Sequence, residues 1–235
     1  MKRQIDVCLT PELVHLQPLD EKLVVVVDIF RATSCMVAGL STGVRSIVPV
    51  ATVEECLSFR EKGYLCAGER GGEKIPEFDI GNSPFEYMGE KAKDRDIAVS
   101  TTNGTLAISR SADASEIIIA GFLNLSATVS YLKNSSKNVV VHCAGWKGTF
   151  NLEDTTFAGA LIELLQDSHE YNTDAAFMAR SLWQQGNGDL YTFLLKSAHA
   201  KRLQKFGIEK DLEYCCKTDE FDKVIAYNKG QLSIH

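Results

Sequence analysis

The amino-acid sequence predicts an α/β fold, layered α/β/α, with a largely parallel or mixed sheet and a helical C-terminal region. Short β-rich runs alternate with helical patterns over the first two-thirds of the chain, which is typical of βαβ units. Uninterrupted apolar runs, VVVV at 24–27 and IIIA at 117–120, fit strands that helices cover on both faces. We expect a single domain over 1–235, with about 170–210 as a candidate helical subdomain.

The elements follow from local patterns taken in chain order. Runs of four to eight residues rich in β-branched side chains indicate strands, and apolar residues at spacings of three and four indicate helices. Strands are expected at 5–9, 23–30, 46–50, 64–67, 97–100, 117–120 and 139–143, and helices at 33–40, 52–62, 84–93, 105–111, 126–133 and 152–166. The helix at 84–93 has a start signal: Ser83 as N-cap, Pro84 in the first turn and Glu86 at the capping-box position.

Beyond residue 170 the pattern becomes helical. TDAAFMARSLWQQ predicts one helix, with Thr173 or Asp174 as its cap, and a second is expected over 189–207, from Asp189 to a closing Gly207. The final stretch, KVIAYNKGQLSIH, predicts a short hairpin that turns at 228–230.

Composition restricts the class of partner and the compartment. A formal net charge of −6 in 235 residues does not favour nucleic acid, although a local cationic pocket for a small anion is compatible with it. We expect no membrane span and no secretory signal, because no apolar run is long enough. Seven cysteines without a CxxC pair indicate reduced thiols in the cytoplasm. A homodimer is the expected assembly.

Polar residues collect at the ends of four predicted strands. They follow the strands at 23–30, 64–67, 97–100 and 139–143, whereas the residues after 46–50 and 117–120 carry little chemistry. Ligands of open α/β sheets bind beyond the carboxyl ends of the strands. The four clusters therefore predict one functional site at this edge of the sheet.

Three of these segments indicate an anionic ligand. STTNGT at 100–105 can present hydroxyls and backbone N–H groups to an anion, or Thr102 or Asn103 can simply cap the helix. Arg70, in GERGG, suits phosphate or sulfonate, or forms a surface ion pair. Arg31 follows a buried strand, where a guanidinium requires an anion, either the substrate or an internal carboxylate.

Carboxylates near the same edge indicate a hard cation. Asp28 could bind Mg²⁺, act as a nucleophile, or only pair with Arg31. Further oxygen ligands could come from Glu69, Glu153 and Asp154, although acids at the start of a helix, as at 153 and 154, favour its dipole regardless of function. Cys143 could be a nucleophile or a buried thiol; CAGWKGTF lacks the arginine that cysteine phosphatases place five residues after the cysteine. Arginines beside carboxylates fit phosphoryl transfer or phosphate-ester hydrolysis.

Four segments resemble the 2-phosphosulfolactate phosphatase family: VVDIFRATSCMV, GERGGEKIPEFDIGNSPFEY, STTNGTLAI and CAGWKGTFNLEDTTFAGAL. The resemblance spans about residues 6 to 165. It implies an α/β, Mg²⁺-dependent hydrolase that converts (2R)-phospho-3-sulfolactate to sulfolactate and phosphate, a step of coenzyme M biosynthesis. One departure is Glu77, where the family pattern has glycine, which affects loop geometry more than chemistry.

The resemblance implies roles for the matching positions, together with Glu153 in the fourth segment. The expected catalytic residues are Asp28, Arg31, Glu69, Arg70 and Cys143, the substrate-binding residues are Thr33, Ser34, Asn82, Ser83, Thr101, Thr102, Asn103 and Gly104, and the Mg²⁺ ligands come from Asp28, Glu69, Asp79 and Asp154. The attacking group would be a metal-bound water or Asp28.

Other functions compete with this one. Haloacid-dehalogenase-type phosphatases carry a second aspartate two residues after the nucleophile, and here that position is Phe30. The alternatives are a metal-dependent phosphatase for another small phosphorylated acid, or a protein that binds the anion without turnover.

Overall fold

The computed structural model describes residues 2–235 and contains one 11-stranded sheet, in the order β5-β4-β6-β3-β11-β10-β7-β2-β8-β1-β9. The strands are β1 Arg3–Cys8, β2 Leu23–Val27, β3 Ser46–Pro49, β4 Leu65–Arg70, β5 Glu73–Lys74, β6 Asp96–Ser100, β7 Glu116–Ala120, β8 Val139–Cys143, β9 His169–Glu170, β10 Ile225–Asn228 and β11 Gln231–Ile234. Central pairs such as β2–β7 and β2–β8 are parallel, whereas the β10–β11 hairpin pairs antiparallel with β7 and β3. The predicted α/β class with a mixed, largely parallel sheet is confirmed.

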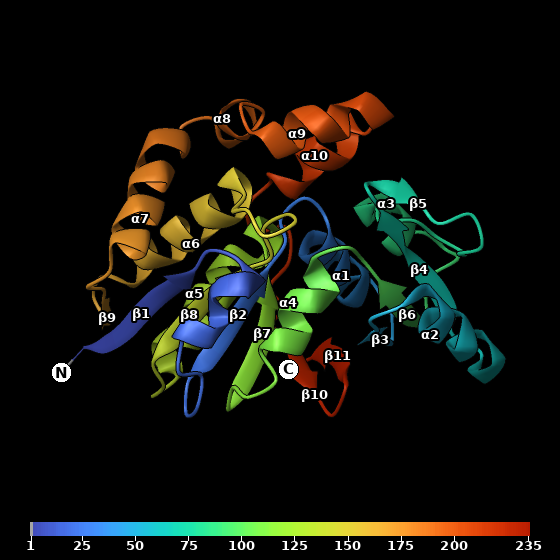
Figure 1. Ribbon diagram of the computed structural model, residues 1–235, viewed down its shortest axis with the longest axis horizontal. Helices are drawn as coiled ribbons and strands as arrows, with labels where there is room; N and C mark the ends of the chain where they lie inside the picture. Colours follow the sequence, from blue (N-terminus) through green and yellow to red (C-terminus); the bar gives the residue numbers. More distant parts are fainter. Residues whose placement is uncertain (1) are drawn as a thin grey trace.

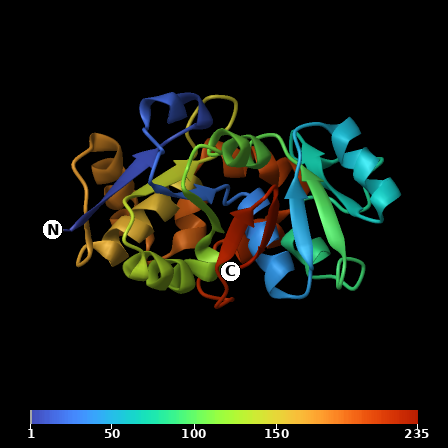
Figure 2. The ribbon, with the colours of Figure 1, turned by 90° about the horizontal axis from the view of Figure 1, so that it is seen from below.

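Helices lie on both sides of the sheet (Figures 1 and 2). They are α1 Ala32–Ser41, α2 Val53–Ser58, α3 Pro84–Tyr87, α4 Gly104–Arg110, α5 Leu125–Asn134, α6 Leu152–Leu165, α7 Asp174–Gly186, α8 Leu190–Leu194, α9 Ala198–Leu203 and α10 Glu209–Cys215, with short 3₁₀ turns at Pro11–Leu16, Phe59–Lys62, Phe122–Asn124 and Gln204–Phe206. No helix among residues 2–235 has the length and apolar character needed to cross a membrane.

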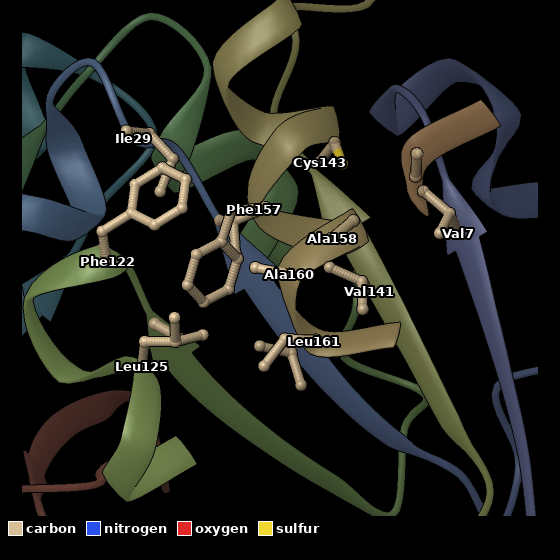
Figure 3. Packing of buried hydrophobic residues seen from close by; sticks show 14 of the residues in the cluster. Val7, Ile29, Phe122, Leu125, Val141, Cys143, Phe157, Ala158, Ala160 and Leu161 are labelled. Carbon is tan, nitrogen blue, oxygen red and sulfur yellow. The ribbon is translucent and has the colours of Figure 1, made fainter. Parts of the chain in front are cut away.

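The valine run of β2 is buried on both faces because its side chains alternate. Val25 and Val27 join a core cluster with α5 and α6, whereas Val24 and Val26 join a second cluster that includes residues of α4. Figure 3 shows α6 packed over the central strands, where the rings of Phe157 and Phe122 meet edge to face. These two layers hold the carboxyl ends of the strands in place.

The C-terminal region is helical, as predicted, but it is more broken than the sequence indicates. The expected helix over 189–207 divides into α8, α9 and a 3₁₀ turn, because the Ser197 hydroxyl accepts a hydrogen bond from the Ala200 N–H and starts a new helix. The expected helix over 84–93 ends at Tyr87, shortly before Gly89, a residue with low helix propensity. The helical subdomain stays a prediction; residues of α7, α8 and α9 join the same core cluster as β2.

Candidate active site

A cleft lies at the carboxyl ends of β2, β4 and β6, beneath α9. In Figure 1, α8, α9 and α10 lie above these strand ends. The residues that line the cleft are Asp28, Phe30, Arg31, Glu69, Gly72, Asn82, Thr102, Asn103, Trp146, His199, Arg202 and Leu203. Six of them were expected from the sequence: Asp28, Arg31, Glu69, Asn82, Thr102 and Asn103.

Asp28 lies directly after β2 and reaches the cleft. Its backbone N–H donates to the Thr33 hydroxyl at 2.9 Å, which orients the turn, and one carboxylate oxygen accepts a long bond of 3.4 Å from the Ala32 N–H. No donor within residues 2–235 bonds the other oxygen, Oδ2, and a Cβ on Gly104 would lie only 2.9 Å from it. Gly104 therefore leaves room for this carboxylate.

The environment of Asp28 favours its protonated form. Burial is the main cause and raises the pKa of Asp28 to about 6; the charges of Glu69 and Glu153 act in the same direction, while His199 opposes them. A buried carboxylate with a free oxygen gains from a cation beside it. Asp28 is therefore the carboxylate best placed to meet a metal ion or a reacting group.

Glu69 joins two of the loops that form the cleft. One of its oxygens accepts from the Gly72 N–H and the other from the Thr102 N–H, both at 2.7 Å. The side chain is buried at the end of β4. Glu69 thus fixes the loops after β4 and β6 relative to each other, and its carboxylate faces the same cleft as Asp28.

Arg31 is buried and meets a carboxylate of the protein itself. Its Nη1 lies 2.5 Å from Oδ2 of Asp211, on α10, and its Nη2 donates to the Gly72 carbonyl at 3.0 Å. Of the two expected anions, the internal carboxylate is the one that neutralises this guanidinium, which also lines the cleft; contact with the substrate stays a prediction. Ser83 donates to the other oxygen of Asp211 and lines an adjoining hollow.

Two polar side-chain atoms in the wall of the cleft have no protein partner. Oδ1 of Asn82 and Oγ1 of Thr102 are buried and unbonded within residues 2–235. Buried polar atoms are normally hydrogen-bonded, so these two indicate that the cleft accommodates a polar ligand. Asn103 occupies the N-cap position of α4, but its side chain makes no capping bond, so capping does not account for this residue.

Several expected substrate-binding hydroxyls support the loops from below. Thr33 accepts from Asp28, the Ser34 hydroxyl donates to the Ile29 carbonyl, and the Thr101 hydroxyl accepts from the Thr105 N–H. All three are buried, and none lines the cleft. Their position makes them part of the framework that holds Asp28 and Thr102.

Arg70 and Asp79 lie outside the cleft. Residue 70 still belongs to β4, so its side chain points to the face opposite Glu69, where it donates to the carbonyl and hydroxyl of Ser100. Asp79 accepts from the Cys66 N–H and pairs with Arg60 at 3.1 Å. The structure therefore brings together Arg31 and Thr102, but not Arg70.

Cys143 and Asp154 lie in the core beneath the cleft. Cys143 has no exposed surface, and burial raises the pKa of its thiol well above the usual value; Figure 3 shows it among the apolar residues beside α6. Asp154 accepts from the N–H groups of Ile29 and Gly145, and burial also raises its pKa. Neither side chain lines the cleft.

The wall formed by α9 was not expected from the sequence. His199, Arg202 and Leu203 lie at positions i, i+3 and i+4 of this helix, so they share one face. Arg202 stacks on the Trp146 ring at 3.9 Å and has no acidic partner within residues 2–235. A Cβ on Gly72 would lie 3.0 Å from Leu203, which shows how closely this region approaches the loop after β4. The i, i+3, i+4 spacing was a signal, but every amphipathic helix shows it.

Comparisons with known proteins agree with one another. A family model described as 2-phosphosulpholactate phosphatase matches residues 8–230. A probable 2-phosphosulfolactate phosphatase of Thermotoga petrophila is 41% identical over 96% of each chain. A protein with the same description from Caldanaerobacter subterraneus subsp. tengcongensis is 38% identical over 90% of each chain. Another, from Clostridium acetobutylicum, is 36% identical over 97% of this chain and 99% of the relative.

Proposed function

The chain belongs to the 2-phosphosulpholactate phosphatase family, and on that premise we propose that it hydrolyses the phosphate ester of (2R)-phospho-3-sulfolactate, with Mg²⁺, to sulfolactate and phosphate. The observation that carries the proposal is the meeting of Asp28 with the guanidinium groups of Arg31 and Arg202 in one cleft. We place the reaction in the cytoplasm, as a coenzyme M biosynthesis-type step.

The cleft suits an ester with several negative charges. Such a substrate carries phosphate, sulfonate and carboxylate groups, and each is an acceptor for charge-assisted hydrogen bonds. Arg202 has no acidic partner within residues 2–235, so its N–H donors are free to bind one of these groups. Arg31 is held in place by Asp211 and presents its remaining donors from the opposite loop.

The residues of the cleft fit a magnesium ion. Within residues 2–235, no three His, Cys, Asp or Glu side chains lie close enough together to hold a metal ion. Mg²⁺, however, commonly binds through one or two carboxylates together with substrate phosphate. Asp28, with its unbonded Oδ2, would hold the ion, and Glu69 lies in the same cleft. When bound, the ion would offset negative charge on the phosphate. Asp79 and Asp154 are less suited, since neither lines the cleft.

A phosphate-release assay tests the proposal with a matched pair of substrates. (2S)-2-Phospholactate has the same spatial arrangement at C2 as the (2R)-sulfonated ester, because the sulfonate changes the priority order of the substituents. It differs only in lacking the sulfonate, so the pair isolates recognition of that group. We expect Mg²⁺-dependent release with kcat/KM at least about 10-fold higher for the sulfonated ester, the value of one charge-assisted contact. Equal values would favour a phosphatase for another phosphorylated acid. Tight binding without released phosphate would favour a non-catalytic anion-binding protein.

A further inference from the structure

A buried histidine–carboxylate pair opens onto the cleft. Nδ1 of His199 lies 2.6 Å from Oε1 of Glu153, and the side chains are 8% and 0% exposed. Nδ2 of Asn151 lies 3.1 Å from the same nitrogen; an amide nitrogen donates, so with a proton on Nδ1 this contact is not a hydrogen bond. Glu153 stands at the start of α6 and His199 on α9, so the pair also joins the core of the sheet to the helix that covers the cleft.

The contact determines which nitrogen of the imidazole faces the substrate. An ionised carboxylate only accepts hydrogen bonds, so the pairing places a proton on Nδ1 of His199. The second nitrogen, Nε2, has no hydrogen-bond partner within residues 2–235 and is not among the fully buried unpartnered atoms. Because His199 lines the cleft, Nε2 is the atom available to a ligand there.

The position of this pair matches a need of the reaction. In hydrolysis of a phosphate monoester the transition state is loose. The bond to the leaving oxygen is largely broken in it, so negative charge develops on that oxygen. The alkoxide of an α-hydroxy acid is a poor leaving group, so a proton donor at this oxygen lowers the barrier. Asp28, Glu69 and His199 all line the cleft, and His199 belongs to α9.

We propose that His199, as an imidazolium with protons on both nitrogens and oriented by Glu153, donates the proton from Nε2 to the ester oxygen of the substrate as the P–O bond breaks, and keeps the proton on Nδ1. The inference rests on the proposed function and adds a catalytic residue, His199, and a positioning residue, Glu153. In the net reaction the bonding pair stays on the ester oxygen, which becomes the hydroxyl of the product. Water supplies the new oxygen on phosphorus; one of its protons stays on the phosphate, and the other restores the imidazolium.

Two substrates with different leaving groups test whether His199 protonates the ester oxygen. We expect His199→Gln to lower kcat/KM on phosphosulfolactate by about 100-fold or more, the usual contribution of a general acid. The variant should lower kcat/KM on p-nitrophenyl phosphate only a few-fold, because p-nitrophenolate leaves without a proton. Equal losses on both esters would overturn the proposal, since they would indicate a role in binding or folding alone.

A second measurement uses one substrate only. The ¹⁸O isotope effect at the bridging oxygen of phosphosulfolactate should increase in His199→Gln, because the departing oxygen then carries more negative charge in the transition state. An unchanged isotope effect would overturn the proposal. This test remains available even if the protein does not hydrolyse p-nitrophenyl phosphate. Glu153→Gln should show the same selective loss, about 10-fold, because the imidazolium loses the negative charge beside Nδ1, although the amide oxygen can still accept its hydrogen bond. It provides an independent variant if His199→Gln does not fold.

The control is His15→Gln, an exposed histidine outside the cleft, which should match the wild type on both esters. Failure of this inference can be told apart from failure of the proposed function. If wild-type protein releases no phosphate from phosphosulfolactate, the proposed function fails. If it does, and the variants lose both esters equally, only the role of the pair fails.

Discussion

The guanidinium of Arg31 and the carboxylate of Asp211 form a buried ion pair, with 2.5 Å between Nη1 and Oδ2, although the residues are 180 positions apart in the chain. The pair joins the loop after β2 to α10, and Ser83 donates to the same carboxylate. The C-terminal helices therefore help to position an arginine of the cleft.

Asp211→Asn should destabilise the fold strongly. Removing one partner leaves the Arg31 charge buried without its counter-ion, a change that costs about 3 kcal/mol or more. Urea unfolding of metal-free protein measures the loss. Asp222→Asn serves as control, because Asp222 forms an exposed ion pair with Lys223 and its loss should leave the unfolding midpoint unchanged. An Asp211→Asn variant as stable as the wild type would show that the pair contributes nothing.

Asp28→Asn should lower turnover by orders of magnitude and leave the fold intact, because it removes the carboxylate with the unbonded oxygen. It should also weaken Mg²⁺ binding, measured by calorimetry without substrate. Asp79→Asn is the informative comparison: Asp79 lies outside the cleft and pairs with Arg60, so Mg²⁺ affinity should persist. Loss of affinity in Asp79→Asn alone would place the metal elsewhere.

Arg202→Gln should raise KM for phosphosulfolactate about 10- to 100-fold, the range of a lost charge-assisted hydrogen bond. The reason is that Arg202, stacked on Trp146, has no acidic partner within residues 2–235 and is free to bind an anion. Steady-state kinetics separate KM from kcat. Lys201→Gln, an exposed neighbour on the same helix, should behave like the wild type, and an unchanged KM in Arg202→Gln would remove this residue from substrate binding.

His142 should make the protein lose stability as the pH is lowered from 6.5 to about 4. Burial, with the charge of Arg110 as a smaller cause, lowers the pKa of this histidine from 6.5 to about 4. In that interval the unfolded chain binds a proton that the native state does not. The free energy of unfolding therefore decreases as the pH is lowered, by about 3 kcal/mol over the whole interval.

His142→Gln should make this part of the pH profile less steep, measured by urea unfolding at several pH values; the rest of the slope belongs to groups such as His169, whose pKa burial also lowers to about 4. The variant also loses the contact between Nδ1 and the Ser111 hydroxyl, at 2.8 Å, so its stability should be lower at pH 7 as well. His15→Gln, with an exposed histidine, should keep the wild-type slope. An identical slope in His142→Gln would show that His142 is not the group responsible.

Local patterns were sufficient for most of the sheet. The run at 24–27 and its counterparts at 117–120 and 139–143 form adjacent strands, because a continuous apolar run can be satisfied only where both faces are covered. The two-residue strands β5 and β9 were missed, since they are too short to show a period. The predicted end of the strand at 64–67 was the error that mattered most for the site. The strand, β4, continues to Arg70, and the side chain of Arg70 therefore points away from the cleft.

The sequence by itself determined the α/β class and the edge of the sheet where polar residues collect. It also singled out six residues that line the cleft: Asp28, Arg31, Glu69, Asn82, Thr102 and Asn103. Only the tertiary structure decided that α9 closes the cleft with His199 and Arg202, that Asp211 neutralises Arg31, and that Cys143 and Asp154 lie below the surface. The physical reason is the range of the interactions. Strand and helix patterns depend on neighbours within a few residues, whereas these contacts join positions far apart in the chain, which only the packing of the layers brings together.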